Sequence, residues 1–260
     1  MLRPEPRPQP PDEVEVWTVP LGSPLGVPPR GLDALLDEEE RARAACLRDV
    51  VCRNRFVTAH AALRSIVGAR LGRAPEQVRF VRGQFGKPEI AHGSGLFLSF
   101  SHSDGIALVA LAPRPVGVDV ERWRSASAAT RIAGRFFPPA EREAVAAAPP
   151  RPGAGGRSAL FARLWTRKEA CVKATGARLC QGLSLPVQGD AGLFTVHGAD
   201  GALAGPWCLA DLAPARGYAG AVALSGSNPF RTALRSWQPT VGGERGEKST
   251  PLRELVPVSV

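Results

Sequence analysis

The chain has 260 residues, of which 44% are hydrophobic and 22% are charged, with a net charge of +9 at neutral pH. This composition is typical of a soluble globular protein with a sizeable core. No apolar run approaches the length that spans a membrane. Residues 1–11 are rich in proline, lack the hydrophobic stretch of a signal peptide and are predicted to be disordered. We therefore expect a cytoplasmic protein.

Hydrophobic periodicity predicts the elements of the chain. In chain order, the first elements are a strand at 13–19 and a helical region at 32–70, whose second part runs from 55 to 71 and stops at Gly72. Strands follow at 78–82, 96–100, 106–111 and 116–121. The remaining elements are a helical region at 128–147 broken at Pro138, a loop at 149–157, a helix at 159–176, and strands at 193–197, 206–211 and 218–224. A connection at 101–105 joins two of these strands, and a loose tail is expected over 226–260.

The order of elements suggests a duplicated unit, because each half runs from an acidic helix through a long helix to strands. The tetrapeptide Gly-Ala-Arg-Leu at 68–71 recurs at 176–179, near the end of each long helix. This repeat is consistent with duplication.

The positive charge indicates an anionic partner, since six of the nine excess charges lie within residues 12–225. A phosphorylated small molecule, an acidic protein and nucleic acid all fit. Nucleic acid is less favoured, because aromatic residues make up only 6% of the chain and do not alternate with basic runs. The five cysteines form no CxxC motif and predict reduced, mostly buried thiols without metal or disulfide roles.

The helix at 159–176 carries the most informative pattern. Trp165, Glu169 and Lys173 recur at i, i+4 and i+8, so their side chains share one face. A surface Glu–Lys pair would explain this spacing and would contribute only about 0.2–0.5 kcal/mol. Lysine usage argues for more: only four of the 33 basic residues are lysines, at 87, 168, 173 and 248. Where arginine has replaced lysine elsewhere, a surviving lysine suggests a need for a compact ammonium group.

An acid pair lies on the strand at 116–121. The valines of this strand alternate with Asp119 and Glu121, so the two carboxylates occupy one face. Alone, they could be solvated acids on an edge strand. Together with Glu169, they form a set of three oxygen ligands suited to magnesium.

Two further segments have anion-binding character. Lys87 lies in the turn 84–88, where flanking Gly and Pro would hold its ammonium rigidly, although a simple loop lysine is the alternative. Ser101 and His102 could bind a phosphate, although a lone histidine could equally be structural. A Ser-His-Asp hydrolase using Asp104 is disfavoured, because adjacent residues rarely form a triad and no G-x-S-x-G motif occurs.

Four motifs, in this order, resemble the Sfp-type 4′-phosphopantetheinyl transferases. They are Phe85-Gly86-Lys87-Pro88, Ser99-Phe100-Ser101-His102-Ser103, Gly117-Val118-Asp119-Val120-Glu121, and Trp165-Thr166-Arg167-Lys168-Glu169 with Lys173 and Gly176. The resemblance covers about residues 30–225 and is to the longer, monomeric branch of the family. It implies an α+β fold with a pseudo-twofold duplication of two similar α/β halves, 12–114 and 115–225, each a small, mainly antiparallel sheet packed with a long helix.

The resemblance also implies the reaction: transfer of the 4′-phosphopantetheine arm of coenzyme A to a serine of an apo acyl or peptidyl carrier protein, with release of 3′,5′-ADP. Carrier proteins are usually acidic, which would account for the basic body. The resemblance implies that Asp119, Glu121 and Glu169 hold Mg²⁺, that Glu169 also accepts the proton, and that Lys173 neutralises charge on the leaving group. It implies that Ser101, His102 and Arg55 bind the 3′-phosphate and that Lys87 lines the nucleotide pocket. Further phosphate-binding candidates are Arg41, Arg43 and Arg48.

Two alternatives remain open: a coenzyme A-binding enzyme with a different acceptor, and a basic nucleic-acid-binding protein. A degenerate transferase that only binds carriers is disfavoured, because the acid set is complete. One position departs from the family pattern, since many relatives have Asn where this chain has Ser99.

Overall fold

The computed structural model describes residues 11–22, 31–83, 85–91, 94–189, 192–198, 203 and 205–239. The predicted Pro-rich head, apart from residue 11, lies outside the described residues, as do residues 240–260. In the described part, none of the helices is both long and apolar enough to cross a membrane.

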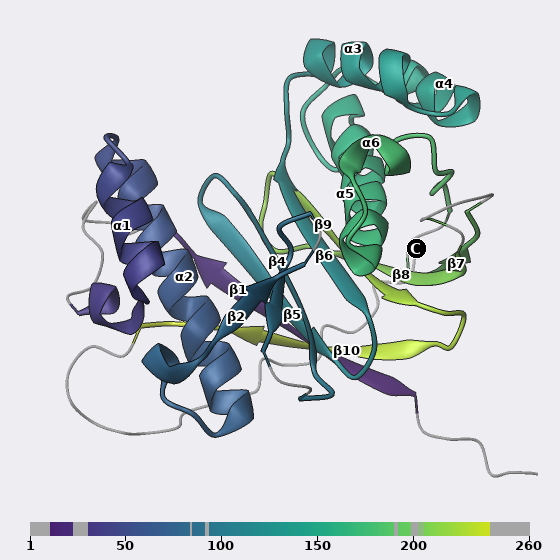
Figure 1. Cartoon of the computed structure of the whole chain (residues 1–260). Helices are drawn as coiled ribbons and strands as arrows, with labels where there is room; N and C mark the ends of the chain where they lie inside the picture. Colours follow the sequence, from purple (N-terminus) through teal and green to yellow (C-terminus); the bar gives the residue numbers. More distant parts are fainter. Residues whose placement is uncertain are drawn as a thin grey trace, which may run out of the picture.

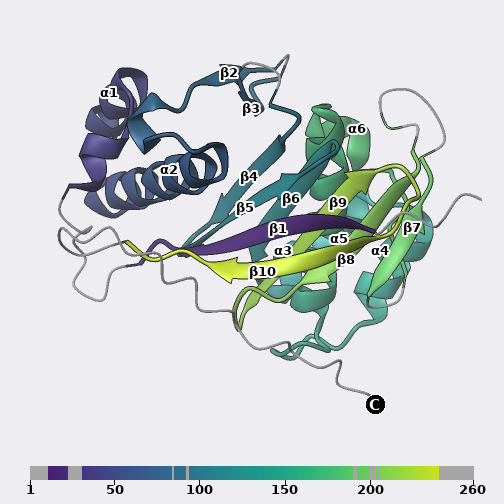
Figure 2. The same cartoon turned by 90° about the horizontal axis from the view of Figure 1, so that it is seen from below.

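Two sheets lie face to face between two long helices (Figures 1 and 2). The first sheet has the strand order β10-β1-β5-β4, formed by β1 (Asp12–Pro20), β4 (Phe97–Ser103), β5 (Ile106–Ala112) and β10 (Phe230–Ser236). The second has the order β6-β9-β8-β7, formed by β6 (Val116–Arg122), β7 (Leu193–Val196), β8 (Trp207–Leu212) and β9 (Tyr218–Ser225). Helix α2 (Val50–Leu71) covers the outer face of the first sheet, and α5 (Arg157–Thr175) covers that of the second.

Shorter elements complete each half. In the first half they are η1 (Leu32–Leu35), α1 (Glu38–Cys46), η2 (Pro75–Gln77) and the hairpin of β2 (Phe80–Arg82) with β3 (Pro88–Ile90). In the second half they are α3 (Ala126–Phe136), α4 (Pro139–Ala147) and α6 (Leu179–Gly182). The predicted α+β fold of two similar halves is confirmed.

Burial follows the alternation of the strands. Every residue of β5 is buried, because Leu108 and Ala110 face the second sheet while Val109 and Leu111 face α2. In β6 the valines share one face, as the sequence predicts. This face packs into the core between the sheets. Asp119 therefore points to the opposite face, toward α5.

The predicted loose tail over 226–260 is wrong for part of its length. Strand β10 pairs in parallel with β1, and the backbone N–H of Trp237 donates to the carbonyl of Thr18 at 3.0 Å. Trp237 also packs against the core beside α2. The strand thus returns from the second half to the first. Such a long-range pairing leaves no local pattern in the sequence.

Two smaller expectations also need correction. Gly68 lies inside α2, whereas Gly176 follows the end of α5 with a φ of 69°, so the repeated tetrapeptide occupies non-equivalent positions. The five cysteines are free thiols, but Cys46, Cys52 and Cys180 are exposed rather than buried.

Serine side chains join the two sheets where β4 and β6 meet. Both are edge strands, so the outward backbone groups of β6 need partners from elsewhere. The Ser99 hydroxyl accepts the Val118 N–H at 2.9 Å, and the Ser103 hydroxyl accepts the Arg122 N–H at 3.1 Å. We call Ser99, Ser101 and Ser103 the serine ladder. Because β4 continues through Ser103, the predicted connection at 101–105 shortens to a turn at Asp104 and Gly105.

We expect Ser99→Ala to lower the free energy of unfolding by about 1–3 kcal/mol, because it leaves the Val118 N–H buried without a partner. Urea unfolding would measure the change. Ser127→Ala, on the exposed face of α3, is the control and should change stability by less than about 0.5 kcal/mol. Equal stability of the two variants would contradict a structural role for the ladder.

Candidate active site

Helix α5 lies unusually close to β6 because of one glycine. A Cβ atom built on Gly117 would meet the carbonyl oxygen of Ala170 at 1.9 Å, which no real side chain could tolerate. The small buried residues Ala170 and Ala174 form the helix side of this contact. Their neighbours Glu169 and Lys173 are thereby brought against the polar face of β6.

Lys173 joins residues from both halves. Its Nζ lies 2.6 Å from Asp119 Oδ1 and donates to the Ser101 hydroxyl at 2.8 Å, while Ser101 donates its own proton to Asp119 Oδ1 at 2.7 Å. The Asp119 side chain is only 4% exposed. Its second oxygen, Oδ2, is buried and has no hydrogen-bond partner among the described residues.

The three acids predicted as ligands influence one another. Burial, followed by the charge of Asp119, raises the pKa of Glu169 to about 7, although Lys173 opposes the shift and Glu121 adds to it. Burial and Asp119 also raise the pKa of Glu121. Carboxylates that repel one another in this way favour a cation between them.

The donor set suits a divalent ion, although the described residues contain no group of three His, Cys, Asp or Glu side chains placed to hold one. The buried, unpartnered Asp119 Oδ2 and the mutual repulsion of the acids are both features that Mg²⁺ would satisfy. The ligand set of Asp119, Glu121 and Glu169 stays a prediction.

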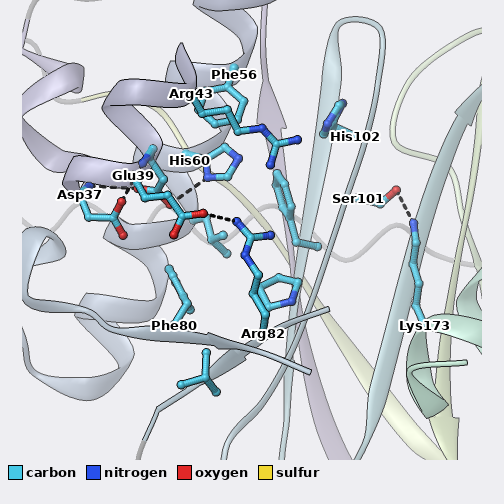
Figure 3. A pocket seen from close by; sticks show the side chains of 15 residues that line it. Asp37, Glu39, Arg43, Phe56, His60, Phe80, Arg82, Ser101, His102 and Lys173 are labelled. Carbon is cyan, nitrogen blue, oxygen red and sulfur yellow. Dashed lines mark hydrogen bonds and ion pairs between the residues drawn. The ribbon is translucent and has the colours of Figure 1, made fainter. Parts of the chain in front are cut away.

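A cavity of about 510 Å³ opens beside Lys173 and extends toward α1 and α2 (Figure 3). Ser101, His102 and Lys173 line one side of it, and Asp37 and Glu39 line the other. Between these sides, Phe56 stacks on His60 with ring centroids 4.0 Å apart, and the Arg43 guanidinium lies over Phe56. Arg82 also lines the cavity.

Cations and rings make this cavity suitable for an anionic ligand with a planar group. Burial, followed by the nearby His60, Lys173 and Arg43, lowers the pKa of His102. The shift favours the neutral ring, which presents one N–H donor. A bound phosphate would offset the repulsion among these groups.

The structure brings some of the predicted residues together at this cavity and places others elsewhere. His102, Lys173 and the candidate Arg43 line the cavity. Ser101 also lines it, but its proton goes to Asp119, so in this arrangement it has none to donate to a phosphate. Arg41 binds the carbonyl of Leu36, and Arg48 is exposed.

Arg55 and Lys87 do not line this cavity. Arg55 forms an ion pair with Asp104 at 2.7 Å. Lys87 donates to the carbonyl of Val116 at 3.0 Å and lines a second cavity of about 350 Å³ near Gly176. Burial lowers the pKa of Lys87 to about 8. Binding of the 3′-phosphate by Arg55 and lining of the nucleotide pocket by Lys87 stay predictions.

Lys168, the other lysine of α5, lies in the protein core. Its Nζ is fully buried, lies 2.6 Å from Glu141 Oε2 on α4 and also donates to the carbonyl of Leu185. Position 168 points into the core between α5 and α4, so its ammonium serves as a counterion there. Lys173, by contrast, lines the cavity.

Sequence reasoning did not identify the network that forms the far wall of the cavity. Arg64 of α2 is buried and bonds to both Asp37 and Glu40, and His60 Nδ1 lies 2.9 Å from Glu40 Oε1. The only local signal is the Asp37–Glu40 capping box that begins α1. The contacts of Arg64 and His60 join distant parts of the chain and have no sequence signature.

Comparisons with known proteins relate the chain to one family. The model of the 4′-phosphopantetheinyl transferase superfamily matches residues 115–223. The chain is 34% identical to the 4′-phosphopantetheinyl transferase HetI of Nostoc sp. over 88% of this chain and 91% of that protein. It is 29% identical to the 4′-phosphopantetheinyl transferase Sfp of Bacillus subtilis over 48% of this chain and 51% of that protein.

The chain therefore belongs to the 4′-phosphopantetheinyl transferase superfamily. The family match coincides with the half that carries β6 and α5. The similarity to HetI extends across both halves, including the helices that enclose the cavity.

The bonds of Glu40 in the wall of the cavity predict how the stability of the protein depends on pH. Burial alone would raise the pKa of Glu40, but bonds from His60 and Arg64 lower it from 4.5 to about 2. A depressed carboxyl pKa stabilises the fold at pH values above 4.5, and this contribution is lost as the pH falls toward 2. We expect Glu40→Gln to destabilise the protein by up to about 3 kcal/mol at pH 6.

The difference between Glu40→Gln and the unmodified protein should shrink steadily as the pH falls from about 5 toward 2, because Glu40 then takes up a proton in the unfolded chain but not in the folded protein. Chemical unfolding across this pH range would measure it. Glu38→Gln, an exposed acid on the same helix, is the control and should show little effect. A difference that does not depend on pH would contradict the assigned charge on Glu40.

Proposed function

We propose that this protein transfers the 4′-phosphopantetheine arm of coenzyme A to a serine of an apo acyl or peptidyl carrier protein, and that the transfer requires Mg²⁺. The arrangement of Lys173, Asp119 and Glu169 beside the cavity carries this proposal. Membership of the superfamily supports it. A serine that attacks a phosphodiester needs charge neutralisation, correct positioning and a proton acceptor, and these residues can supply all three.

Asp119, Glu121 and Glu169 would hold the magnesium ion. When bound, Mg²⁺ would neutralise charge on the pyrophosphate of coenzyme A. Glu169 would accept the proton of the attacking serine, directly or through water. Asp119 would serve two cations at once, because Oδ1 already contacts Lys173 while Oδ2 has no hydrogen-bond partner among the described residues.

Lys173 would stabilise the leaving 3′,5′-ADP. Its ammonium is fixed by Asp119 and Ser101 and lines the cavity, so it can remain close to the bridging oxygen as negative charge develops there. His102 and Arg43 would contact phosphate groups within the cavity. Arg55 and Lys87 would take part only by leaving their present partners, Asp104 and the carbonyl of Val116.

The acceptor would be an acidic carrier protein attracted by the basic body of the chain. We propose that the enzyme acts as a monomer, because both halves of one chain contribute to the site. Ser101 comes from the first half, and Asp119 and Lys173 come from the second. Transfer to another acceptor and nucleic-acid binding gain no specific support from the site.

The reaction is tested by intact-mass spectrometry of an apo carrier protein incubated with the enzyme, coenzyme A and Mg²⁺. The carrier should gain the mass of one phosphopantetheine group, and EDTA should prevent the gain. Transfer that continues in EDTA would contradict the metal requirement. No gain with fatty-acid, polyketide or peptide-synthetase carriers would contradict the proposed function.

Two substitutions test the residue roles. We expect Asp119→Asn and Glu169→Gln each to reduce transfer by at least about 100-fold, because each removes an oxygen charge from the proposed ion site. Circular dichroism should show an intact fold. Glu143→Gln, an exposed acid on α4, is the matched control and should retain full activity. Comparable turnover in all three variants would refute the assignment.

A further inference from the structure

Ser103 differs from the other members of the serine ladder because it contacts Glu121. Its hydroxyl accepts the Arg122 N–H at 3.1 Å and donates to Glu121 Oε2, also at 3.1 Å. A hydroxyl has a single proton, and the N–H of Arg122 occupies its acceptor side. The proton of Ser103 is thereby directed toward the carboxylate.

Glu121 has few other groups to hold it. In the part of the chain that the structure describes, its one ion pair within 4 Å is with Arg124, whose Nη2 lies 3.8 Å from the same oxygen. The Arg124 side chain is 48% exposed, and an ion pair of this kind contributes little. Ser103 is thus the close hydrogen-bond donor that sets the orientation of the Glu121 carboxylate.

The rest of the ladder provides an internal comparison. Ser99 accepts a backbone N–H of β6 in the same way, but it has no hydrogen bond to a carboxylate among the described residues. Ser101 contacts Asp119 and Lys173, and so belongs to the active site itself. Ser99 and Ser103 therefore share the task of joining the strands, and only Ser103 adds a contact to a proposed metal ligand.

We propose that Ser103 is a positioning residue for the divalent ion, and that it acts by fixing the Glu121 carboxylate from the opposite half of the molecule. This inference rests on the proposed function, since it requires that Glu121 binds the ion. It assigns a role to the second serine of the Ser-His-Ser segment, which is separate from any contact with coenzyme A.

Hydrogen bonds that orient a metal ligand commonly change metal affinity by 10–100-fold when they are removed. We expect Ser103→Ala to weaken binding of the ion by about tenfold. The KM for coenzyme A should stay nearly unchanged, because Ser103 is not among the described residues that line the cavity beside Lys173. Ser103→Thr keeps the hydroxyl and should restore most of the affinity.

The probe is Mn²⁺, titrated into the full-length protein with coenzyme A but without carrier, so that no turnover occurs. Electron paramagnetic resonance of free Mn²⁺ gives its dissociation constant. Ser99→Ala is the matched control, because it removes the same kind of bond to β6 without touching Glu121. A parallel transfer assay gives the Mg²⁺ activation constant separately from the KM for coenzyme A.

The proposal is supported if Ser103→Ala alone weakens Mn²⁺ binding and raises the Mg²⁺ activation constant, with rescue by Ser103→Thr. It is overturned if Ser103→Ala binds Mn²⁺ as the unmodified protein does, or if Ser99→Ala weakens binding equally, since the effect would then come from strand packing. If the unmodified protein binds no Mn²⁺, the proposed metal requirement fails and this inference fails with it.

Discussion

The active site depends on the contact between β4 and β6, two edge strands that serine side chains join in place of a shared backbone ladder. This junction sets Ser101 of the first half against Asp119 of the second. Because side chains alternate along a strand, a slip of one residue would turn Asp119 into the core between the sheets and bring a valine to the site. Gly117 imposes a matching constraint from the other side, since only glycine allows α5 to lie close enough for Lys173 to reach Asp119.

The site also balances opposite charges across a short distance. Three acids lie on one side, where burial and mutual repulsion raise the pKa values of Glu169 and Glu121. On the other side the cavity gathers Lys173, Arg43, His60 and His102, and burial, followed by the other three groups, lowers the pKa of His102. Lys173 stands between the two groups and partly neutralises the first. Such a site is suited to a ligand that brings a cation to the acids and phosphates to the cavity at the same time, as a magnesium complex of coenzyme A would.

Local periodicity predicted the elements that hold the site, but not the contacts between distant elements. The shared face of Glu169 and Lys173, and the alternation that exposes Asp119 to α5, follow from helical and strand geometry alone. The pairing of β10 with β1 joins strands more than 200 residues apart and has no local signal. Lysine usage indicated a need for an ammonium group at Lys168 and Lys173 alike, because the scarcity of lysine in a sequence does not distinguish an ammonium in a core from one at a cavity. The family resemblance placed Ser101 on a phosphate, whereas its proton is directed to Asp119 by the neighbouring strand.

A repeated ion pair shows the duplication more clearly than the repeated Gly-Ala-Arg-Leu sequence does. Arg64 and Lys168 each lie seven residues before the last residue of their long helix, α2 and α5 respectively. Each is fully buried and pairs with a glutamate of the short helix that comes before, Glu40 on α1 and Glu141 on α4. Each also donates to a backbone carbonyl beyond its helix, that of Val78 or Leu185.

The two long helices differ at the positions of the proposed catalytic pair. At the same offsets from the helix end, Glu169 and Lys173 correspond to Ser65 and Ala69 of α2. The halves have therefore kept the same device for fixing the long helix, while only the second helix carries the proposed catalytic pair, and the first contributes residues such as Phe56 and His60 to the wall of the ligand cavity.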